Sequence, residues 1–209
     1  MPETRRHLSM LRSYTRSDAL TIGNAACGMI AIFLCLDYLA TGTRGLLWIV
    51  FVLLPLALVF DALDGYVARL DRTRQSAIGA DLDSLADVIS FGVAPAVLGF
   101  TLGLRGGWDM VILTGFVVCG VSRLARFNVT AAALTDASTG KVKYFEGTPI
   151  TSSLLIVLLL GAAVLSGRIH DDVWFGVYRI GPAALHPLTL VYALSGSAMI
   201  SATLRIPKP

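Results

Sequence analysis

The sequence predicts an all-α polytopic membrane protein with six transmembrane helices. Of its 209 residues, 55% are hydrophobic and only 15% are charged, and the mean hydropathy is +0.72. Soluble domains carry about 25% charged residues and about 45–50% apolar ones. The chain therefore has too few polar groups to cover a surface that faces water. This composition excludes a soluble globular enzyme, a disordered protein and a nucleic-acid-binding arm, so we expect no nucleic-acid partner.

Six apolar stretches supply the predicted helices. Each approaches the ~20 residues needed to cross a hydrocarbon core of ~30 Å. They cover residues 20–40, 46–68, 80–102, 108–127, 151–168 and 183–204. We expect no cleaved signal peptide before the first of them. The stretches form one transmembrane catalytic domain, residues 20–209, which follows a basic N-terminal segment, residues 1–19.

Local features support the individual spans. The second contains an unbroken apolar run over residues 46–60. Trp48 and Trp108 lie near the ends of the second and fourth spans, where aromatic belts are expected. The fifth span follows a long loop, residues 128–150, and His186-Pro187 indicates the start of the last helix.

The positions of lysine and arginine predict the orientation in the membrane. With six spans, both termini lie on one side. Thirteen of the seventeen basic residues fall at the termini and in the second and fourth loops; the other four are Arg44, Arg105, Arg168 and Arg179. The termini and these two loops are therefore expected to face the cytoplasm, in a bacterial inner membrane or an endoplasmic reticulum membrane. The segment from His7 to Arg16 is either an amphipathic helix on anionic lipid or a basic tail that sets topology.

Six of the fourteen acidic residues lie between Asp61 and Asp87. Asp61 and Asp64 are three residues apart, and Asp83 and Asp87 are four apart, so each pair shares one face of its helix. The loop between the two spans is short, so the helices are antiparallel neighbours. The two pairs of carboxylates are therefore expected to face each other near the cytoplasmic end of the bilayer.

A metal site explains this cluster better than structural ion pairs do. An ionised carboxylate within the bilayer costs ~2.5–3.5 kcal/mol, and four together repel one another. Ion pairs with Arg69 and the other arginines of the second loop account for exposed acidic residues. They do not account for Asp61 and Asp64, which follow the apolar run of the second span. Ligands that are all oxygen suit Mg²⁺ or Mn²⁺, with Ca²⁺ also acceptable. Four carboxylates favour two bridged ions, an arrangement that serves chemistry at phosphorus.

Small residues lie between the aspartates. Gly65, Ala68 and Gly79 leave room for a flat ring or a phosphate to approach the helix backbone, and Arg69 supplies a cation for phosphate oxygens. Taken alone, small residues on a membrane helix indicate close helix packing. Their interleaving with the aspartates favours a ligand site.

The complete pattern, Asp61-x₂-Asp64-Gly65-x₂-Ala68-Arg69-x₉-Gly79-x₃-Asp83-x₃-Asp87, resembles the motif of the CDP-alcohol phosphotransferases. Other stretches are similar to the serine-using branch of that family, the phosphatidylserine synthases. They are residues 21–28, 83–95, 123–128 and 143–149, and the tail from residue 199 resembles fungal-type members.

The resemblance implies a six-helix fold, usually a homodimer, with an active site open to the cytoplasmic leaflet. The implied reaction transfers the phosphatidyl group of CDP-diacylglycerol to the hydroxyl of L-serine, giving phosphatidylserine and CMP. The four aspartates would hold two Mg²⁺ or Mn²⁺ ions, and Asp87 would also act as general base. Residues implied at the CDP group are Asp64, Gly65, Ala68, Arg69 and Gly79.

Three further polar residues are candidates for substrate contacts. Arg126 is the preferred partner of the serine carboxylate, with Arg123 on the acceptor or on phosphate; both could equally be anchors that reach the lipid headgroups. Asn24, inside the first span, would contact the donor phosphates or hydrogen-bond another helix.

The sequence allows two alternative functions. A member of the same family could use another acceptor, such as inositol, inositol phosphate or glycerol phosphate. A cation-coupled membrane transporter is the second alternative, since intramembrane carboxylates also occur in transporters. A transporter predicts ionisable residues distributed through the spans, or helices broken at mid-bilayer.

Overall fold

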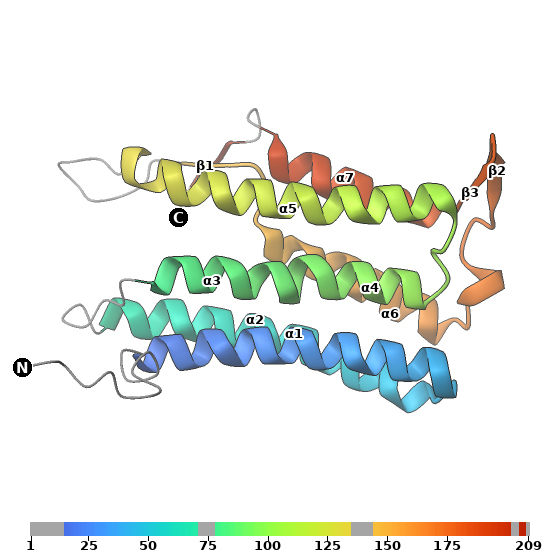
Figure 1. The fold of residues 1–209 in the computed structure, drawn as a ribbon, viewed down its shortest axis with the longest axis horizontal. Helices are drawn as coiled ribbons and strands as arrows, with labels where there is room; N and C mark the ends of the chain where they lie inside the picture. Colours follow the sequence, from blue (N-terminus) through green and yellow to red (C-terminus); the bar gives the residue numbers. More distant parts are fainter. Residues whose placement is uncertain (1–14, 71–77, 135–143, 202–204, 208–209) are drawn as a thin grey trace, which may run out of the picture.

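The computed structural model describes residues 15–70, 78–134, 144–201 and 205–207 (Figure 1). The predicted N-terminal segment up to residue 14, including its amphipathic alternative, lies outside the described residues. The basic residues of the loops 71–77 and 135–143 lie outside them as well. Within the described parts the chain is predominantly helical, which confirms the all-α class.

Four helical rods are long and apolar enough to cross a membrane, and they match the first four predicted spans. In chain order they are α1 (Arg16–Thr41), α2 (Arg44–Leu70), the continuous rod of α3 (Gly79–Asp87), η2 (Val88–Val93) and α4 (Ala94–Thr101), and α5 (Gly107–Leu134). Two shorter apolar helices take the places of the fifth and sixth spans. They are α6 (Ser153–Leu165), led by the 3₁₀ turn η3 (Ile150–Ser152), and α7 (Leu190–Ile200), led by η5 (Pro187–Thr189).

The sequence did not predict the short strands. β1 (Tyr144–Glu146) pairs antiparallel with β4 (Arg205–Pro207), and β2 (Tyr178–Ile180) pairs antiparallel with β3 (Ala183–Leu185), after the short 3₁₀ turn η4 (His170–Asp172). The predicted start of the sixth span at residue 183 is therefore wrong, whereas the helix start predicted at His186-Pro187 is confirmed. Gly181 has a φ of 62°, which suits the turn between β2 and β3, and the helix begins only at Pro187, whose fixed φ favours a first helical turn.

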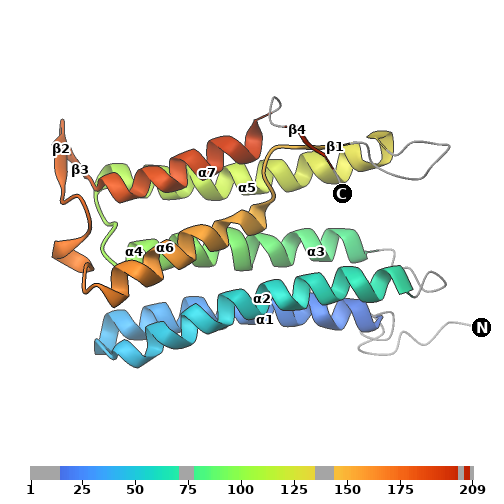
Figure 2. The same ribbon diagram turned by 180° about the vertical axis from the view of Figure 1, so that it is seen from behind.

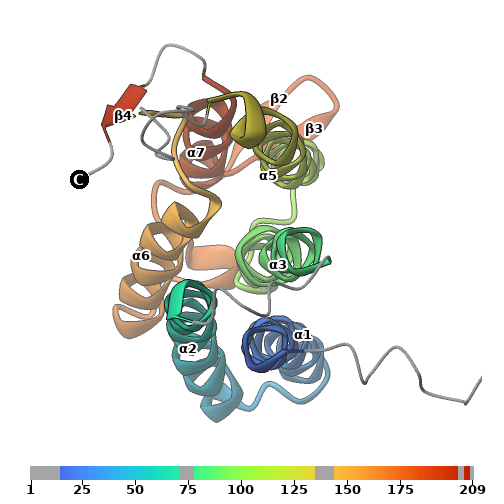
Figure 3. The same ribbon diagram turned by 90° about the vertical axis from the view of Figure 1, so that its left-hand side faces the viewer.

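The rod of α3, η2 and α4 occupies the middle of the bundle. Viewed along the helices, it lies between the α1–α2 pair and the α5–α7 pair, with α6 alongside (Figure 3). Its centre is a π-helical turn, in which the Ala94 N–H donates to the Ile89 carbonyl. The turn precedes Pro95, which lacks an N–H, and widening of a helix is one way to accommodate a proline.

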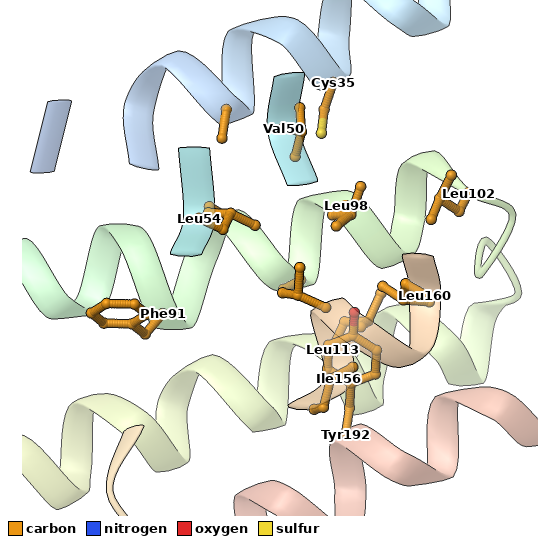
Figure 4. Close-up of a cluster of buried hydrophobic side chains, with 14 of the residues drawn as sticks. Cys35, Val50, Leu54, Phe91, Leu98, Leu102, Leu113, Ile156, Leu160 and Tyr192 are labelled. Atoms are coloured by element: carbon orange, nitrogen blue, oxygen red, sulfur yellow. The ribbon is translucent and has the colours of Figure 1, made fainter. Parts of the chain in front are cut away.

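Apolar side chains from several helices pack around this rod (Figure 4). Leu98 of α4 is fully buried, as are Leu54 of α2 and Leu160 of α6. Tyr192 of α7 is fully buried too, and its hydroxyl donates to the Pro95 carbonyl at 2.7 Å. A buried tyrosine hydroxyl needs such a partner, so this bond ties α7 to the central rod.

Polar contacts stabilise the end of the bundle that carries β2 and β3. The buried Asp109 carboxylate accepts hydrogen bonds from the backbone N–H groups of Gly106 and His186, from His186 Nδ1 and from Thr189 Oγ1. At the same end, Tyr38 Oη and His170 Nε2 lie 2.8 Å apart. Burial, together with the Arg105 guanidinium, lowers the pKa of His170 and so favours its neutral form.

The outer surface of the helices is apolar. Val52, Val111, Leu155, Leu158 and Leu194 are each more than half exposed. Water-soluble monomers rarely expose apolar area on this scale, whereas helices with satisfied backbones and apolar outer faces suit lipid. The arrangement is that of a multi-pass membrane protein.

Candidate active site

Three of the four predicted carboxylates meet between α2 and α3. Asp61, Asp83 and Asp87 each offer an oxygen, and these oxygens all lie within 4.8 Å of one another. Asp61 lies seven residues before Ala68, where the apolar span of α2 ends, and Asp87 lies eight residues after Gly79, where the next span begins. At ~1.5 Å per residue, both carboxylates lie ~10–12 Å inside their spans. Figure 2 shows the ends of α2 and α3 side by side at the end of the bundle opposite β2 and β3.

The fourth carboxylate, Asp64, lies beside this group rather than within it. It interacts electrostatically with Asp61 and Asp83. Its Oδ2 accepts a hydrogen bond from Thr21 Oγ1 of α1 at 2.5 Å, and the Asp64 side chain is buried. The sequence therefore predicted the neighbourhood of all four carboxylates, and the structure separates one of them by its partner on α1.

The donor set suits a hard divalent cation. The carboxylate oxygens of Asp61 and Asp83 lie within 4.8 Å of each other, and two carboxylates this close require either a proton on one of them or a cation between them. Asn24 Oδ1, next to Asp87, is buried and has no hydrogen-bond partner among the described residues. Carboxylate and amide oxygens are the ligands that Mg²⁺, Mn²⁺ and Ca²⁺ accept.

α1 contributes the closest polar partner of Asp87. Asn24 Nδ2 donates to Asp87 Oδ1 at 3.0 Å, and both residues are buried. The reverse orientation of the amide would place two acceptor oxygens against each other, so this contact fixes which atom of the amide faces the carboxylate. The bond places Asn24 at the cluster but not on a phosphate, so its predicted contact with the donor stays a prediction.

The π-helical turn η2 begins directly after Asp87 and packs against α1. Ser90 Oγ donates to the Asn24 carbonyl at 2.8 Å. A Cβ on Gly28 would lie 2.5 Å from Ser90 Oγ and 2.7 Å from Ser90 Cα. Glycine at position 28 is therefore what lets α1 approach the rod closely enough for Asn24 to reach Asp87.

α5 brings a cation to the opposite side of Asp87. Arg123 is half-buried, interacts electrostatically with Asp87, and has its guanidinium carbon 5.7 Å from the centroid of the Phe127 ring. Arg126 is exposed, three residues further along the same helix. Asn128 and Ser84 hydrogen-bond to each other at 3.0–3.2 Å and so connect α5 to α3 near the site.

The small residues of the motif have different environments. Gly65 and Gly79 are half-buried, and Ala68 is exposed. Gly79 is the first residue of α3, so it marks where the chain re-enters the bundle. Arg69 belongs to α2, but its side chain lies outside the described residues, and its predicted contact with pyrophosphate stays a prediction.

Several polar residues of the structure were missed by reasoning from the sequence. Thr21 and Ser90 looked like ordinary small polar residues of apolar helices. Asp109, inside the predicted fourth span, had a usable signal, because an acidic residue within a membrane span needs a partner. Its partners lie at the far end of the bundle, so it belongs to the architecture and not to the carboxylate cluster.

Comparisons with known proteins identify the family of the chain. Residues 14–191 match the family model described as CDP-alcohol phosphatidyltransferase. The chain is 45% identical over 205 residues to a CDP-diacylglycerol–serine O-phosphatidyltransferase of Saccharomyces cerevisiae, covering 97% of this chain and 74% of that protein. It is 39% identical over 135 residues to an archaetidylserine synthase of Methanothermobacter thermautotrophicus, covering 64% and 52%. It is 35% identical over 159 residues to a CDP-diacylglycerol–serine O-phosphatidyltransferase of Helicobacter pylori, covering 75% and 60%.

Proposed function

Because the chain belongs to the CDP-alcohol phosphatidyltransferase family, we propose that it transfers the phosphatidyl group of CDP-diacylglycerol to L-serine and releases CMP. The observation that carries this proposal is the 45% identity, over 97% of the chain, to a serine O-phosphatidyltransferase. The grouped carboxylates of Asp61, Asp83 and Asp87 supply a site of the required chemistry.

We propose that the carboxylates of Asp61, Asp64, Asp83 and Asp87 hold two divalent cations, Mg²⁺ or Mn²⁺. Such ions would neutralise the pyrophosphate and stabilise CMP as leaving group. Asn24 Oδ1, which has no partner in the described part of the chain, and the closeness of the Asp61 and Asp83 oxygens support a cation at this place. Gly65, Ala68 and Gly79 would border the cytidine, and Arg69 would contact the phosphates.

Asp87 takes the proton of the serine hydroxyl in this mechanism. As the proton leaves, the serine oxygen forms a bond to the phosphorus that carries diacylglycerol, and the bond from that phosphorus to CMP breaks. Arg123, an electrostatic neighbour of Asp87, would orient the incoming acceptor. Arg126 would bind the serine carboxylate, because a planar guanidinium suits a carboxylate at two points.

A second donor lipid has specific support. The archaeal relative is named an archaetidylserine synthase. The names of these relatives thus agree on serine and differ in the lipid. Our proposal takes diacylglycerol as the lipid, because the identity and coverage are higher for the yeast protein.

We also propose an orientation in the membrane and an oligomeric state for the enzyme. The termini and the carboxylates face the cytoplasm, as the distribution of basic residues predicts, and two copies form a homodimer. Chemical cross-linking in native membranes followed by denaturing electrophoresis tests the homodimer. A band at twice the monomer mass supports it, and monomer alone at every cross-linker concentration contradicts it.

The reaction itself is tested with purified protein, CDP-diacylglycerol, Mn²⁺ or Mg²⁺, and a panel of alcohols, with CMP release as the measurement. CMP release that depends on L-serine is expected. CMP release with inositol, inositol phosphate or glycerol phosphate, but not with L-serine, would overturn serine as the acceptor. If no alcohol in the panel supports CMP release, the transferase is overturned and a cation transporter becomes the alternative.

A further inference from the structure

The buried face of α1 is polar at the end where the carboxylates lie. Thr21, Asn24 and Gly28 follow one another at spacings of three and four residues, so they share this face. All three are buried, and the other buried residues of this helix from Cys27 onward include the apolar Cys27, Ala31 and Cys35. A polar patch inside an apolar helix is expensive in a membrane unless it has a partner.

Each polar side chain of this face binds a different carboxylate. Thr21 Oγ1 donates to Asp64 Oδ2 at 2.5 Å, across 43 residues of sequence, and Asn24 Nδ2 donates to Asp87 Oδ1 at 3.0 Å, across 63 residues. Asp64 belongs to α2 and Asp87 to the end of α3. α1 therefore touches both helices that supply the carboxylates.

The face is held in place by backbone contacts as well. Ser90 Oγ donates to the Asn24 carbonyl, and Gly28 lies directly against Ser90. Thr21 Oγ1 also lies within 3.2 Å of the Ser17 carbonyl. A side chain whose own orientation is locked can in turn lock the carboxylate that it binds.

We propose that Thr21 and Asn24 are positioning residues, which fix Asp64 and Asp87 at the spacing that binding of divalent cations and transfer require. This inference rests on the proposed function. It means that α1, which contains none of the motif aspartates, determines the geometry of the site. Asn24 then acts through Asp87, in place of a direct contact with the donor phosphates.

Thr21→Val and Thr21→Ser separate positioning from packing. Valine keeps the shape of threonine without the hydroxyl, and serine keeps the hydroxyl. Removal of a group that orients a metal ligand typically costs 10–100-fold in metal affinity. Binding of Mn²⁺ to the purified protein, followed by loss of the free-ion electron paramagnetic resonance signal, is expected to weaken at least about tenfold in Thr21→Val.

Thr21→Ser is expected to bind Mn²⁺ within about twofold of the wild type, since it retains the donor. Thr114→Val, on the exposed face of α5, is the matched control and should leave binding unchanged. If Thr21→Val binds Mn²⁺ like the wild type, or if serine is as damaging as valine, the positioning role of Thr21 is wrong.

Asn24→Leu tests the second contact, because leucine is similar in size and cannot donate. Positioning predicts that kcat falls at least about tenfold while KM for CDP-diacylglycerol stays within about twofold. A raised KM with unchanged kcat would instead identify Asn24 as a phosphate contact and overturn this part. Wild-type protein that binds Mn²⁺ but releases no CMP refutes the proposed function, and Mn²⁺ binding by the Thr21 variants still decides the positioning role.

Discussion

Asp87 is the residue on which the site converges. It is buried, it accepts a hydrogen bond from Asn24 of α1, and it interacts electrostatically with Arg123 of α5. Its position directly before the π-helical turn places it where the central rod changes its helical pitch. Three separate parts of the chain therefore determine where one carboxylate points.

Replacing Asp87 by asparagine is expected to stop transfer while leaving donor binding largely intact. Asparagine keeps the size of the side chain but cannot take a proton, and loss of a general base typically lowers a rate 10²–10⁴-fold. CMP release and equilibrium binding of a CDP-lipid, measured on the same preparation, test this prediction. Asp37→Asn, at the exposed far end of α1, is the control. Full turnover by Asp87→Asn would remove Asp87 from the role of base.

The two arginines of α5 are predicted to serve the acceptor. Lysine at position 126 keeps the charge but loses the two-point contact, and a hydrogen bond between charged groups contributes ~1.5–3 kcal/mol. The Arg126→Lys variant should therefore raise KM for L-serine about tenfold or more, with unchanged affinity for CDP-diacylglycerol. Steady-state kinetics with each substrate varied in turn measure both constants. An equal loss for both substrates would favour an anchoring role at the lipid headgroups.

At the scale of the elements, the contact between α1 and η2 lies next to Asp87, the proposed general base. Gly28→Ala places a methyl group against Ser90, whose backbone cannot easily move within a buried rod. Overpacking of this kind costs ~1–3 kcal/mol, and here it also separates Asn24 from Asp87. We expect both a lower thermal unfolding midpoint and reduced CMP release.

Gly115→Ala on α5 is the matched control for this element. A Cβ at Gly115 meets nothing within 4 Å, and alanine is favoured over glycine within a helix by ~0.5–1 kcal/mol. Its unfolding midpoint, measured by fluorescence of a thiol dye or by circular dichroism, should be equal or higher. If the two variants behave alike, close packing of α1 on the rod is not what positions Asn24.

The sequence and the structure agree best where a pattern is local. The spacing of Asp61 and Asp64, and of Asp83 and Asp87, predicted one shared site, because helical periodicity relates residues three or four apart. Thr21 gave no such signal, since a threonine in an apolar helix can satisfy its hydroxyl on a carbonyl of the preceding turn, as Thr21 also does with Ser17. Its contact with Asp64 depends on how α1 packs against α2.

Element boundaries were predictable only where composition changes. The predicted apolar span included residues 183–185, yet these pair with β2, whereas the helix start that His186-Pro187 indicated is correct. The π-helical turn was equally hidden, although Pro95 was visible in the sequence. Both features depend on neighbouring elements, and hydropathy carries no information about those neighbours.

At the scale of the whole molecule, a single labelling experiment tests the orientation in the membrane. In a Cys119→Ala background, Ile78→Cys lies at the start of α3 and Val177→Cys lies near β2, and both positions are exposed. A maleimide that cannot cross membranes should label Val177→Cys in right-side-out vesicles, and Ile78→Cys only after permeabilisation. The reverse pattern would place the carboxylates on the other side.

The two short helices have a consequence for the surrounding lipid. The segments Ile150–Leu165 and Pro187–Ile200 extend ~24 Å and ~21 Å at 1.5 Å per residue, less than a hydrocarbon core of ~30 Å. A span shorter than the core thins the bilayer next to it, at a cost of fractions of a kcal/mol per Å. We therefore expect the bilayer to be thinner beside α6 and α7 than beside α1 and α2. Such hydrophobic mismatch would favour residence in membranes of smaller thickness.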